Sequence, residues 1–591
     1  MMRKKIVSLC MALALCLGLL PVTALAAGED APGTLWVGQT QITASGYWKT
    51  TTEGNLITGS ENDYNVYYDG NGTLTLNGAT IQGGTSTGSV PYGAGIYAQC
   101  NSEESVSLTI KLISENTITG FYGIYVNAEI SADSYGTDAS LTITGESNGS
   151  LKVSGSYHGI YVKSGTGGAS LNINDASVVA SSSSSYSSYA GVYVQSSAHA
   201  TSSPQLSLKV NGGSLTASGT GSSDGILFYV GSSNATGATT SLTVSQNAIV
   251  DARNGGISAS RISETLPTPK PTGENSSGIV FDGSTGTVYG SVTLQEDLTI
   301  GEGESLTIPD GSSLNCNGKL TNNGTILASG GTVTGSLSDG STVTTPSISQ
   351  QPTGQTVTEG SAAMFSVTAS AGDSETPTYQ WQQSTDNGGS WANIESATSA
   401  KYTTEATTTS MSGNQYRCVV TGSGVSVISA PATLTVNAAA TTITTQPSNV
   451  TVTEGETATF SVTATGSNLT YQWQQSTDGS AWANISGATS SSYTTQAATM
   501  DMDGWQYRCV VTDGNSNGVT SQAATLTVTA ATVSVTGVSL DKTELSLTVG
   551  DTETLTATIT PDNATNKNVT WSSDDTSVAT VDTSEIGRAH V

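Results

Sequence analysis

The four residues GIYV occur at 123–126 and again at 159–162, and the near copy GVYV occurs at 191–194. Glycines at equivalent places extend this series to Gly95, Gly123, Gly159, Gly191, Gly225 and Gly256, which are 28, 36, 32, 34 and 31 residues apart. A second series of alternating segments begins at Leu74, Leu108, Leu141, Leu171, Leu206 and Leu242, with steps of 34, 33, 30, 35 and 36. Two independent series with one period indicate a repeated supersecondary unit.

Each unit reads as short alternating strands separated by Gly, Ser, Asn and Thr, without a helical period. A unit this small cannot bury a core alone, whereas stacked units can share one. We therefore predict an all-β chain whose residues 27–345 form a right-handed parallel β-helix, a solenoid with one coil per repeat. Ile124, Ile160 and Val192 would then line one internal column.

The repeat changes after Gly278. Leu298, Leu306 and Leu314 are eight residues apart, and such short steps predict a narrower end to the solenoid. The Pro-rich segment LPTPKPTG at 266–273 separates the two parts, and we expect it to lie outside the core strands because proline cannot donate to a β-ladder.

A different repeat follows. YQWQQSTDNGGSWANI at 379–394 recurs as YQWQQSTDGSAWANI at 471–485, and YRCVVT recurs at 416–421 and 507–512. A tryptophan on one strand, and a tyrosine two residues before a cysteine on another, resemble the immunoglobulin-type β-sandwich. We therefore predict tandem immunoglobulin-like sandwiches over 346–437 and 442–530.

The usual partner cysteine of such sandwiches would fall near Val367 and Val462, so both modules lack the inter-sheet disulfide. The resemblance implies that each tryptophan packs against a lone buried thiol. No CxxC pair is present, so no metal knuckle is visible. The predicted core residues of the C-terminal half are Trp381, Tyr416, Cys418, Trp473, Tyr507, Cys509 and Trp571.

The segment from Val535 to Asp582 resembles the group 2 bacterial Ig-like module, which we assign to 533–582. It stops before the last strands that such modules need. The hexapeptide IGRAHV at 586–591 is what a common sequencing adapter encodes in one reading frame. We interpret 583–591 as an artefact and expect the natural chain to continue, with any wall anchor in the missing part.

Residues 1–26 read as a secretory signal: Arg3-Lys4-Lys5, an apolar run over 6–20, and Ala24-Leu25-Ala26 as the cleavage site. An uncleaved membrane anchor is the alternative, but the run is short for a span of about 20 residues. The prediction is a secreted, extracellular protein with no membrane span in the mature chain. Cleavage moves the net charge from −28 to −31, which disfavours nucleic acid as a partner.

The N-terminal half also resembles a group of exported bacterial proteins with a pectate-lyase-like, carbohydrate-binding β-helix. The resemblance rests on LWVGQTQITASGYWKT at 35–50, DYNVYYDGNGTLTLNGATI at 63–81 and the GIYV coils, and covers about 34–340. It specifies the fold better than the ligand, and it implies carbohydrate binding or a lyase-like activity.

Signals for catalysis are weak. GxSxG occurs four times, but a nucleophile elbow needs a strand–turn–helix context and no helix is expected. His158, His199 and His590 are separated, and the calcium-loop-like DGNSNG at 513–518 has Ala524 where the bidentate glutamate should stand. We therefore predict no enzyme and no cofactor, with calcium left open and a lyase acting on acidic polysaccharide as an alternative.

Tyrosines form the best candidate site. One set shares a position in the GIYV coils, and a second precedes the coil glycine by one to three residues. The candidate glycan-binding residues are Tyr97, Tyr125, Tyr161 and Tyr193 in the first set and Tyr92, Tyr122, Tyr157 and Tyr189 in the second. The tyrosines of the first set alternate along the strand with the Ile and Val positions of the core. We therefore predict that their rings lie on the outer face of the strand, where sugar rings could stack. The alternative is that these rings only stabilise a sheet face.

These observations predict an exported, monomeric cell-surface protein whose β-helix head binds polysaccharide or a host or cell-wall glycan, or mediates adhesion, on an Ig-like stalk. A purely structural or adhesive spacer without a sugar site is the main alternative.

Overall fold

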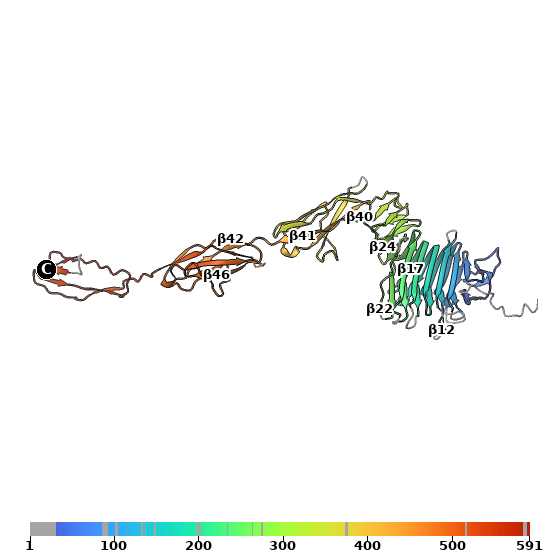
Figure 1. The fold of residues 1–591 in the computed structure, drawn as a ribbon, viewed down its shortest axis with the longest axis horizontal. Coiled ribbons are helices and arrows are strands. Elements are labelled where there is room, and N and C mark those ends of the chain that lie inside the picture. Colours follow the sequence, from blue (N-terminus) through green and yellow to red (C-terminus); the bar gives the residue numbers. More distant parts are fainter. Residues whose placement is uncertain are drawn as a thin grey trace, which may run out of the picture. The chain divides into compact units, whose positions relative to one another are not determined.

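The computed structural model describes residues 31–84, 93–100, 104–131, 134–135, 137–146, 149–197, 203–232, 235–262, 264–272, 276–372, 376–514, 517–582 and 588–590. The predicted signal segment, Tyr92 and His199 lie outside these residues. The regular secondary structure of the described chain is almost entirely β-strand, with short 3-10 helices η2 (Thr409–Met411) and η3 (Met500–Met502), which confirms the all-β prediction (Figure 1). Within it, no helix is long and apolar enough to cross a membrane.

Contacts divide the chain into two compact units. One contains 1–355, 364–403 and 413–434, and the other contains 356–363, 404–412 and 435–591. The first unit begins with short antiparallel strands, of which β1 (Thr34–Val37) runs antiparallel to β8 (Ile96–Gln99). These strands are β1 (Thr34–Val37), β2 (Thr40–Ile42), β3 (Gly46–Thr50), β4 (Leu56–Thr58) and β5 (Val66–Tyr68).

Strands one repeat apart then pair in parallel and form three columns, which together we call the repeat stack. The GIYV column consists of β8 (Ile96–Gln99), the second part of β10 (Glu115–Asn127) and of β14 (Ser150–Ser164), β16 (Ala190–Ser196), β18 (Asp224–Val230) and β21 (Ile257–Arg261). The leucine column consists of β6 (Thr73–Leu76), β9 (Val106–Leu112), β13 (Ala139–Gly145), the first part of β15 (Ala169–Ser182) and of β17 (Gln205–Ser218), and β19 (Thr239–Ser245). The third column consists of β7 (Thr80–Gln82), the remaining parts of those long strands, β20 (Ala248–Ala252) and β23 (Gly278–Asp282).

The register of the GIYV column follows the sequence repeat. Ile124 pairs with Ile160, and Ile160 pairs with Val192; all three are fully buried in one continuous core. In the leucine column the strand register differs from the one that the sequence repeat predicts, because Leu171 pairs with Leu208 rather than with Leu206. The shift is two residues, so the same face stays buried.

The glycine that begins each GIYV copy is required by close backbone packing. A Cβ atom added to Gly159 would lie 2.6 Å from the Gly191 carbonyl oxygen and 2.7 Å from the Ser181 amide nitrogen. At Gly123 it would lie 2.5 Å from the Gly159 carbonyl oxygen. Any side chain at these corners would collide with the neighbouring repeat.

After β23 the repeat becomes shorter and forms a second core. Leu306 pairs in parallel with Ile326, and Leu314 with Val333, so pairing partners are about twenty residues apart. The eight-residue steps at 298, 306 and 314 separate consecutive strands within one such unit. The strands are β24 (Thr285–Tyr289), β25 (Ser291–Thr293), β26 (Leu298–Ile300), β27 (Ser305–Pro309), β28 (Ser313–Asn315), β29 (Leu320–Asn322), β30 (Thr325–Ser329) and β31 (Thr332–Thr334).

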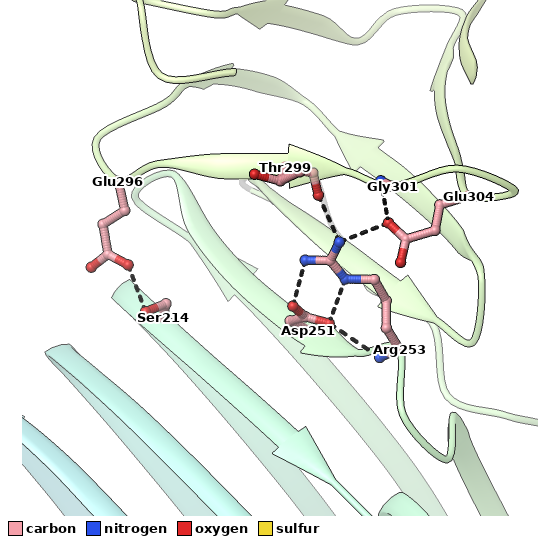
Figure 2. Close-up of polar contacts among 7 residues, drawn as sticks. All are labelled: Ser214, Asp251, Arg253, Glu296, Thr299, Gly301 and Glu304. Atoms are coloured by element: carbon pink, nitrogen blue, oxygen red, sulfur yellow. Dashed lines mark hydrogen bonds and ion pairs between the residues drawn. The ribbon is translucent and has the colours of Figure 1, made fainter. Parts of the chain in front are cut away.

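A charged cluster joins the two parts of the repeat stack (Figure 2). The Arg253 guanidinium binds both carboxylate oxygens of Asp251 at 2.9 and 2.7 Å, Glu304 Oε2 at 2.8 Å and the Thr299 carbonyl oxygen at 2.6 Å. Its other contact is the Phe281 ring, 4.6 Å from the guanidinium carbon. Because Asp251 precedes the change of period and Glu304 follows it, these bonds fix the two cores in register.

The end of the repeat stack pairs with a strand from the first sandwich. Strand β40 (Val425–Ile428) runs parallel to β30, with Ile326 opposite Val425. Val425 is fully buried in the second core of the stack. The last strand on this side of the repeat stack, β30, is therefore paired with a strand about a hundred residues further along the chain.

Two similar sandwiches follow. The strands of the first are β32 (Ser347–Gln350), β33 (Gln355–Thr358), β34 (Met364–Ser366), β35 (Thr368–Ser370), β36 (Thr378–Ser384), β37 (Ala392–Asn393), β38 (Lys401–Thr403), β39 (Gln415–Gly422), β40 and β41 (Ala432–Asn437). Those of the second are β42 (Thr442–Thr445), β43 (Val450–Thr453), β44 (Thr459–Ser461), β45 (Thr463–Thr465), β46 (Thr470–Ser476), β47 (Ala483–Asn484), β48 (Ser492–Thr494), β49 (Gln506–Thr512), β50 (Gly518–Thr520) and β51 (Ala524–Thr529).

The tryptophan and cysteine of each sandwich lie directly opposite each other on paired strands. Trp381 faces Cys418 between β36 and β39, and Trp473 faces Cys509 between β46 and β49. All four side chains are fully buried, as are Tyr416 and Tyr507. The two indole Nε1 groups donate to the carbonyl oxygens of Ser399 and Ser490 at 2.9 and 3.0 Å.

Neither sandwich has a disulfide, because Cys418 and Cys509 are free thiols. Burial raises the pKa of Cys418 to about 12 and that of Cys509 to about 11, so both stay protonated and unreactive at neutral pH. Val367 and Val462, where partner cysteines would stand, are buried apolar residues instead.

We therefore expect the melting temperature of residues 346–530 to be the same with and without a reducing agent. The check is thermal melting of the full chain in the presence and absence of an excess of phosphine reductant, followed by tryptophan fluorescence. A drop of several degrees on reduction would reveal a disulfide that stabilises the fold.

The third module has strands β52 (Gly537–Leu540), β53 (Thr552–Thr554), β54 (Ala557–Thr560), β55 (Thr580–Asp582) and β56 (Arg588–His590). Trp571 is only partly buried, so the expectation that it is a core residue is wrong. Several apolar side chains are exposed, such as Val549 at 88% and Val578 at 64%. The interpretation of 583–591 as an artefact stays a prediction.

Candidate ligand-binding surface

The first set of tyrosines lies on the GIYV column, on the side opposite the isoleucine core. Tyr125 pairs with Tyr161, and Tyr161 with Tyr193, and their rings stack at centroid distances of 4.5 and 5.0 Å. The predicted parity is therefore correct. The predicted exposure is wrong: Tyr97, Tyr125, Tyr161 and Tyr193 are only 1%, 4%, 7% and 9% exposed.

These four rings form a second, smaller core outside the main one, which we call the inner tyrosine column. Trp36 on β1 packs against one part of it, and Tyr122 and Tyr229 pack against others. The Tyr161 hydroxyl also donates a hydrogen bond to Gln195 Oε1. Covered in this way, the inner column has no open face on which a sugar ring could stack.

Ring contacts show that the second set of tyrosines lies against the first. Tyr122 lies 5.0 Å from Tyr125 and 5.7 Å from Tyr161, measured between ring centroids. His158 occupies the equivalent place one repeat later, 4.9 Å from Tyr161 and 4.5 Å from Tyr193. The aromatic residues that precede each coil glycine therefore cover the tyrosines that follow it.

The outermost aromatic residues form a strip along consecutive repeats, which we call the outer aromatic strip. Tyr157 and Tyr189 stack at 4.8 Å with an interplanar angle of 17°, and Phe121 lies 5.5 Å from Tyr157. Tyr186 stands edge-on to Tyr189 at 6.4 Å. Tyr157 is 37% exposed and Tyr186 is 72% exposed, while Phe121 and Tyr189 are half-buried.

His158 is a packed, neutral side chain. It is 3% exposed, and the backbone N–H of Ala190 donates to its Nδ1 at 3.0 Å. Burial lowers its pKa to about 3, so the imidazole is uncharged at neutral pH. A triad histidine would instead use Nδ1–H to donate to a carboxylate, so this arrangement does not fit a Ser-His-Asp site.

Most basic residues of the repeat stack are held by carboxylates. The ion pairs are Lys49–Asp63, Lys111–Glu146, Lys163–Glu129, Arg253–Asp251, Arg253–Glu304, Arg261–Glu264 and Lys319–Asp297. Lys152, Lys209 and Lys270 are exposed. Within the described residues, no group of three or more His, Cys, Asp or Glu side chains is arranged to hold a metal ion.

The Pro-rich segment predicted to lie outside the core strands packs over the side of the stack. Pro269 and Pro271 are buried, and beside them is a cavity of about 110 Å³ lined in part by Lys270, Asp282 and Tyr289. The Asp282 carboxylate is already engaged, because its Oδ1 accepts a hydrogen bond from the backbone N–H of Ile257 at 2.7 Å. The cavity is too small for more than one small group.

Sequence reasoning missed two aromatic groups. Phe121 and Tyr186 extend the outer strip, and the signal was available, because both precede a coil glycine by two to five residues. The other group joins Tyr47, Tyr64 and Tyr67 near the N-terminal end, with Tyr47 and Tyr67 stacked at 4.5 Å. All three lie in the motifs at 35–50 and 63–81 that carry the resemblance to the β-helix proteins.

Two family models match the C-terminal half. The bacterial Ig-like domain (group 2) matches residues 534–589, and a domain of unknown function, DUF8696, matches 347–438 and 440–530. The predicted group 2 module is thereby confirmed, and the two DUF8696 matches coincide with the two predicted sandwiches. The chain is an immunoglobulin-domain-containing bacterial protein.

Curated relatives match only parts of the chain. Endoglucanase C of Cellulomonas fimi is 33% identical over 181 residues, 30% of this chain and 16% of that protein. An uncharacterized protein of Clostridium acetobutylicum is 63% identical over 41 residues, 7% of this chain and 4% of that protein. The chain thus spans less than a fifth of the length of either relative.

Solved structures with immunoglobulin domains are similar to part of the chain. Titin domains Z1Z2, solved with telethonin, are 24% identical with a TM-score of 0.23, covering 32% of this chain and all of that one. The four N-terminal Ig domains of Dscam1 are 20% identical with a TM-score of 0.21, covering 36% of this chain and 50% of that one. Such scores carry no argument about function.

Proposed function

We propose that this chain is an exported bacterial surface protein whose repeat stack, a right-handed parallel β-helix of pectate-lyase-like type, binds polysaccharide through the outer aromatic strip. The immunoglobulin-like modules are the stalk that carries it. The observation that carries the proposal is the run of Phe121, Tyr157 and Tyr189 across three successive repeats.

The strip has the geometry of a stacking surface for a linear polymer. Its rings recur at centroid distances of 4.8 and 5.5 Å, close to the separation of neighbouring strands. The apolar C–H face of a sugar packs well on the electron-rich face of an aromatic ring, and tyrosine hydroxyls can bond to sugar hydroxyls. The partial similarity to an endoglucanase also supports a carbohydrate-related role.

The proposal is for binding rather than catalysis. In the described part of the stack, His158 is neutral and packed, and most basic side chains are bound to carboxylates. A lyase would need a free basic residue beside clustered carboxylates; Lys152, Lys209 and Lys270 are exposed, but among the described residues no such cluster lies beside them. Enzymatic activity is therefore the less favoured proposal.

We expect the double change Tyr157→Ala and Tyr189→Ala to weaken polysaccharide binding by tenfold or more while the fold persists. Each aromatic contact contributes about 0.5–1.5 kcal/mol, so two together approach or exceed the 1.4 kcal/mol of a tenfold change. The measurement is binding of the full mature chain to a panel of plant, bacterial and host polysaccharides.

Val179→Ala is the matched control, because Val179 is 36% exposed, like Tyr157, but lies on another column. It should leave binding unchanged. If no polysaccharide binds the wild type, or if the double variant binds as well as the wild type, the strip is not a sugar site and the spacer alternative gains support.

A further inference from the structure

Each sandwich carries the same four side chains on the outer face of its tryptophan–cysteine strand pair. In the first, Arg417 lies over the Trp391 ring, with 4.1 Å from the guanidinium carbon to the ring centroid. In the second, Arg508 lies over Trp482, also at 4.1 Å. The loop before the tryptophan is one residue shorter in the second sandwich, yet the stacking distance is the same.

A row of amides fixes each guanidinium from the other side. Arg417 Nε donates to Gln382 Oε1 at 2.7 Å, and Gln382 Nε2 donates to Asn393 Oδ1 at 2.9 Å. The equivalent bonds in the second sandwich, through Gln474 and Asn484, are both 2.8 Å. Only the Nε edge of each guanidinium is used in these contacts.

The terminal nitrogens of both guanidinium groups are left open. Among the described residues, no carboxylate lies within ion-pair distance of Arg417 or Arg508, although acidic residues outnumber basic ones 46 to 18 in this chain. Arg253 and Arg261 of the repeat stack, in contrast, are paired with glutamate or aspartate. Among the described residues, the two sandwich arginines are half-buried positive charges without a carboxylate partner.

We propose that Arg417 and Arg508 are carboxylate-binding sites for an acidic, uronate-bearing polysaccharide. A guanidinium presents two parallel N–H groups that match a carboxylate, and one already oriented by stacking and by a glutamine loses little freedom on binding. The adjacent side chains are neutral amides, Gln382 and exposed Asn393, which suit sugar hydroxyls rather than a second charge.

The duplication favours a polymer as the ligand. The two arginines occupy equivalent positions in the two sandwiches, so the chain carries the same site twice. A polysaccharide that bears a carboxylate on successive sugars offers many groups that either site can bind. These sites are separate from the outer aromatic strip and do not depend on it.

The test is binding of the full mature chain to polygalacturonate, with the fully methyl-esterified polymer as the matched ligand control. We expect the wild type to bind the acid form and not the ester, because esterification removes the carboxylate and leaves the sugar backbone. Arg417→Gln with Arg508→Gln should weaken binding at least tenfold, and each arginine changed to lysine should also lose most of it, because lysine lacks the planar fork.

Lys401→Gln is the protein control, because Lys401 is an exposed lysine of the first sandwich on β38 and its loss changes the net charge by one, as each single Arg→Gln change does. It should alter affinity less than twofold. Equal binding of the ester, unchanged binding by the double glutamine variant, or equally strong binding of poly-glutamate that competes with the sugar would each overturn the proposal. If the glutamine variants unfold, the lysine variants and the ester comparison still decide it. Changing Tyr157 and Tyr189 should not affect this binding, which separates it from the function proposed for the stack.

Discussion

Changing Tyr125, Tyr161 and Tyr193 together to alanine should unfold the repeat stack. Each ring is at most 9% exposed and stacks on its neighbours in the inner tyrosine column. Truncating one large buried aromatic side chain costs about 3–5 kcal/mol, and a whole domain is stable by only about 5–15 kcal/mol. Three such changes in contact with one another therefore exceed or exhaust the stability of the stack.

The measurement is calorimetry of the full chain, in which the transition of the stack should be lost while that of the second sandwich remains. Circular dichroism should show the matching loss of β-structure. The double change at Tyr157 and Tyr189 is the control, because these outer rings contribute less buried area and should leave the transition in place. An unchanged stack transition in the triple variant would mean that the inner column is not a core.

Changing Gly159 to alanine should lower the stability of the stack by about 3 kcal/mol, the upper end of the usual cost of overpacking. The new methyl group would lie 2.6 Å from the Gly191 carbonyl oxygen and 2.7 and 3.0 Å from the Ser181 backbone nitrogen and oxygen. All three atoms belong to paired strands and cannot move aside without breaking the register between repeats. With an unfolding entropy of about 2.1 cal/mol/K per residue, this loss in a unit of about 300 residues corresponds to roughly 5 °C in melting temperature.

Ser156→Ala is the matched control for this change. Ser156 is an exposed residue of the same strand, three positions earlier, and its loss should change stability by less than about 0.5 kcal/mol. Both variants are compared by thermal melting of the full chain. Equal melting temperatures for the two would contradict the close contact between repeats at the coil glycine.

The repeat period and the side of each strand could be predicted from the sequence, because both follow directly from residue spacing. Ile124, Ile160 and Val192 share one core as their common position in the GIYV copies indicates. The exact partner at Leu206 could not be predicted. A two-residue shift keeps the same face buried, so the alternation of residues does not distinguish Leu206 from Leu208.

The exposure of the tyrosines depends on contacts that spacing does not reveal. Parity shows that Tyr161 points away from the isoleucine core, but not that His158 and Tyr122 fold back over it. An outward side of a strand is not a solvent-exposed surface when the preceding turn covers it. The Arg417–Trp391 contact could not be predicted from the sequence for a similar reason, because 26 residues separate the two along the chain.

Oxidative footprinting of tyrosine side chains by hydroxyl radicals, with and without a bound polysaccharide, tests the central claim most directly. In the free full chain, Tyr157 and Tyr186 should be oxidised readily and Tyr189 moderately, whereas Tyr97, Tyr125, Tyr161 and Tyr193 should be nearly inert. A polysaccharide that binds the stack should protect Tyr157 and Tyr189 and leave the inner column unchanged. Rapid oxidation of the inner column, or no protection of the outer strip at saturating polysaccharide, would contradict the division into a buried column that supports the fold and an exposed strip that binds the ligand.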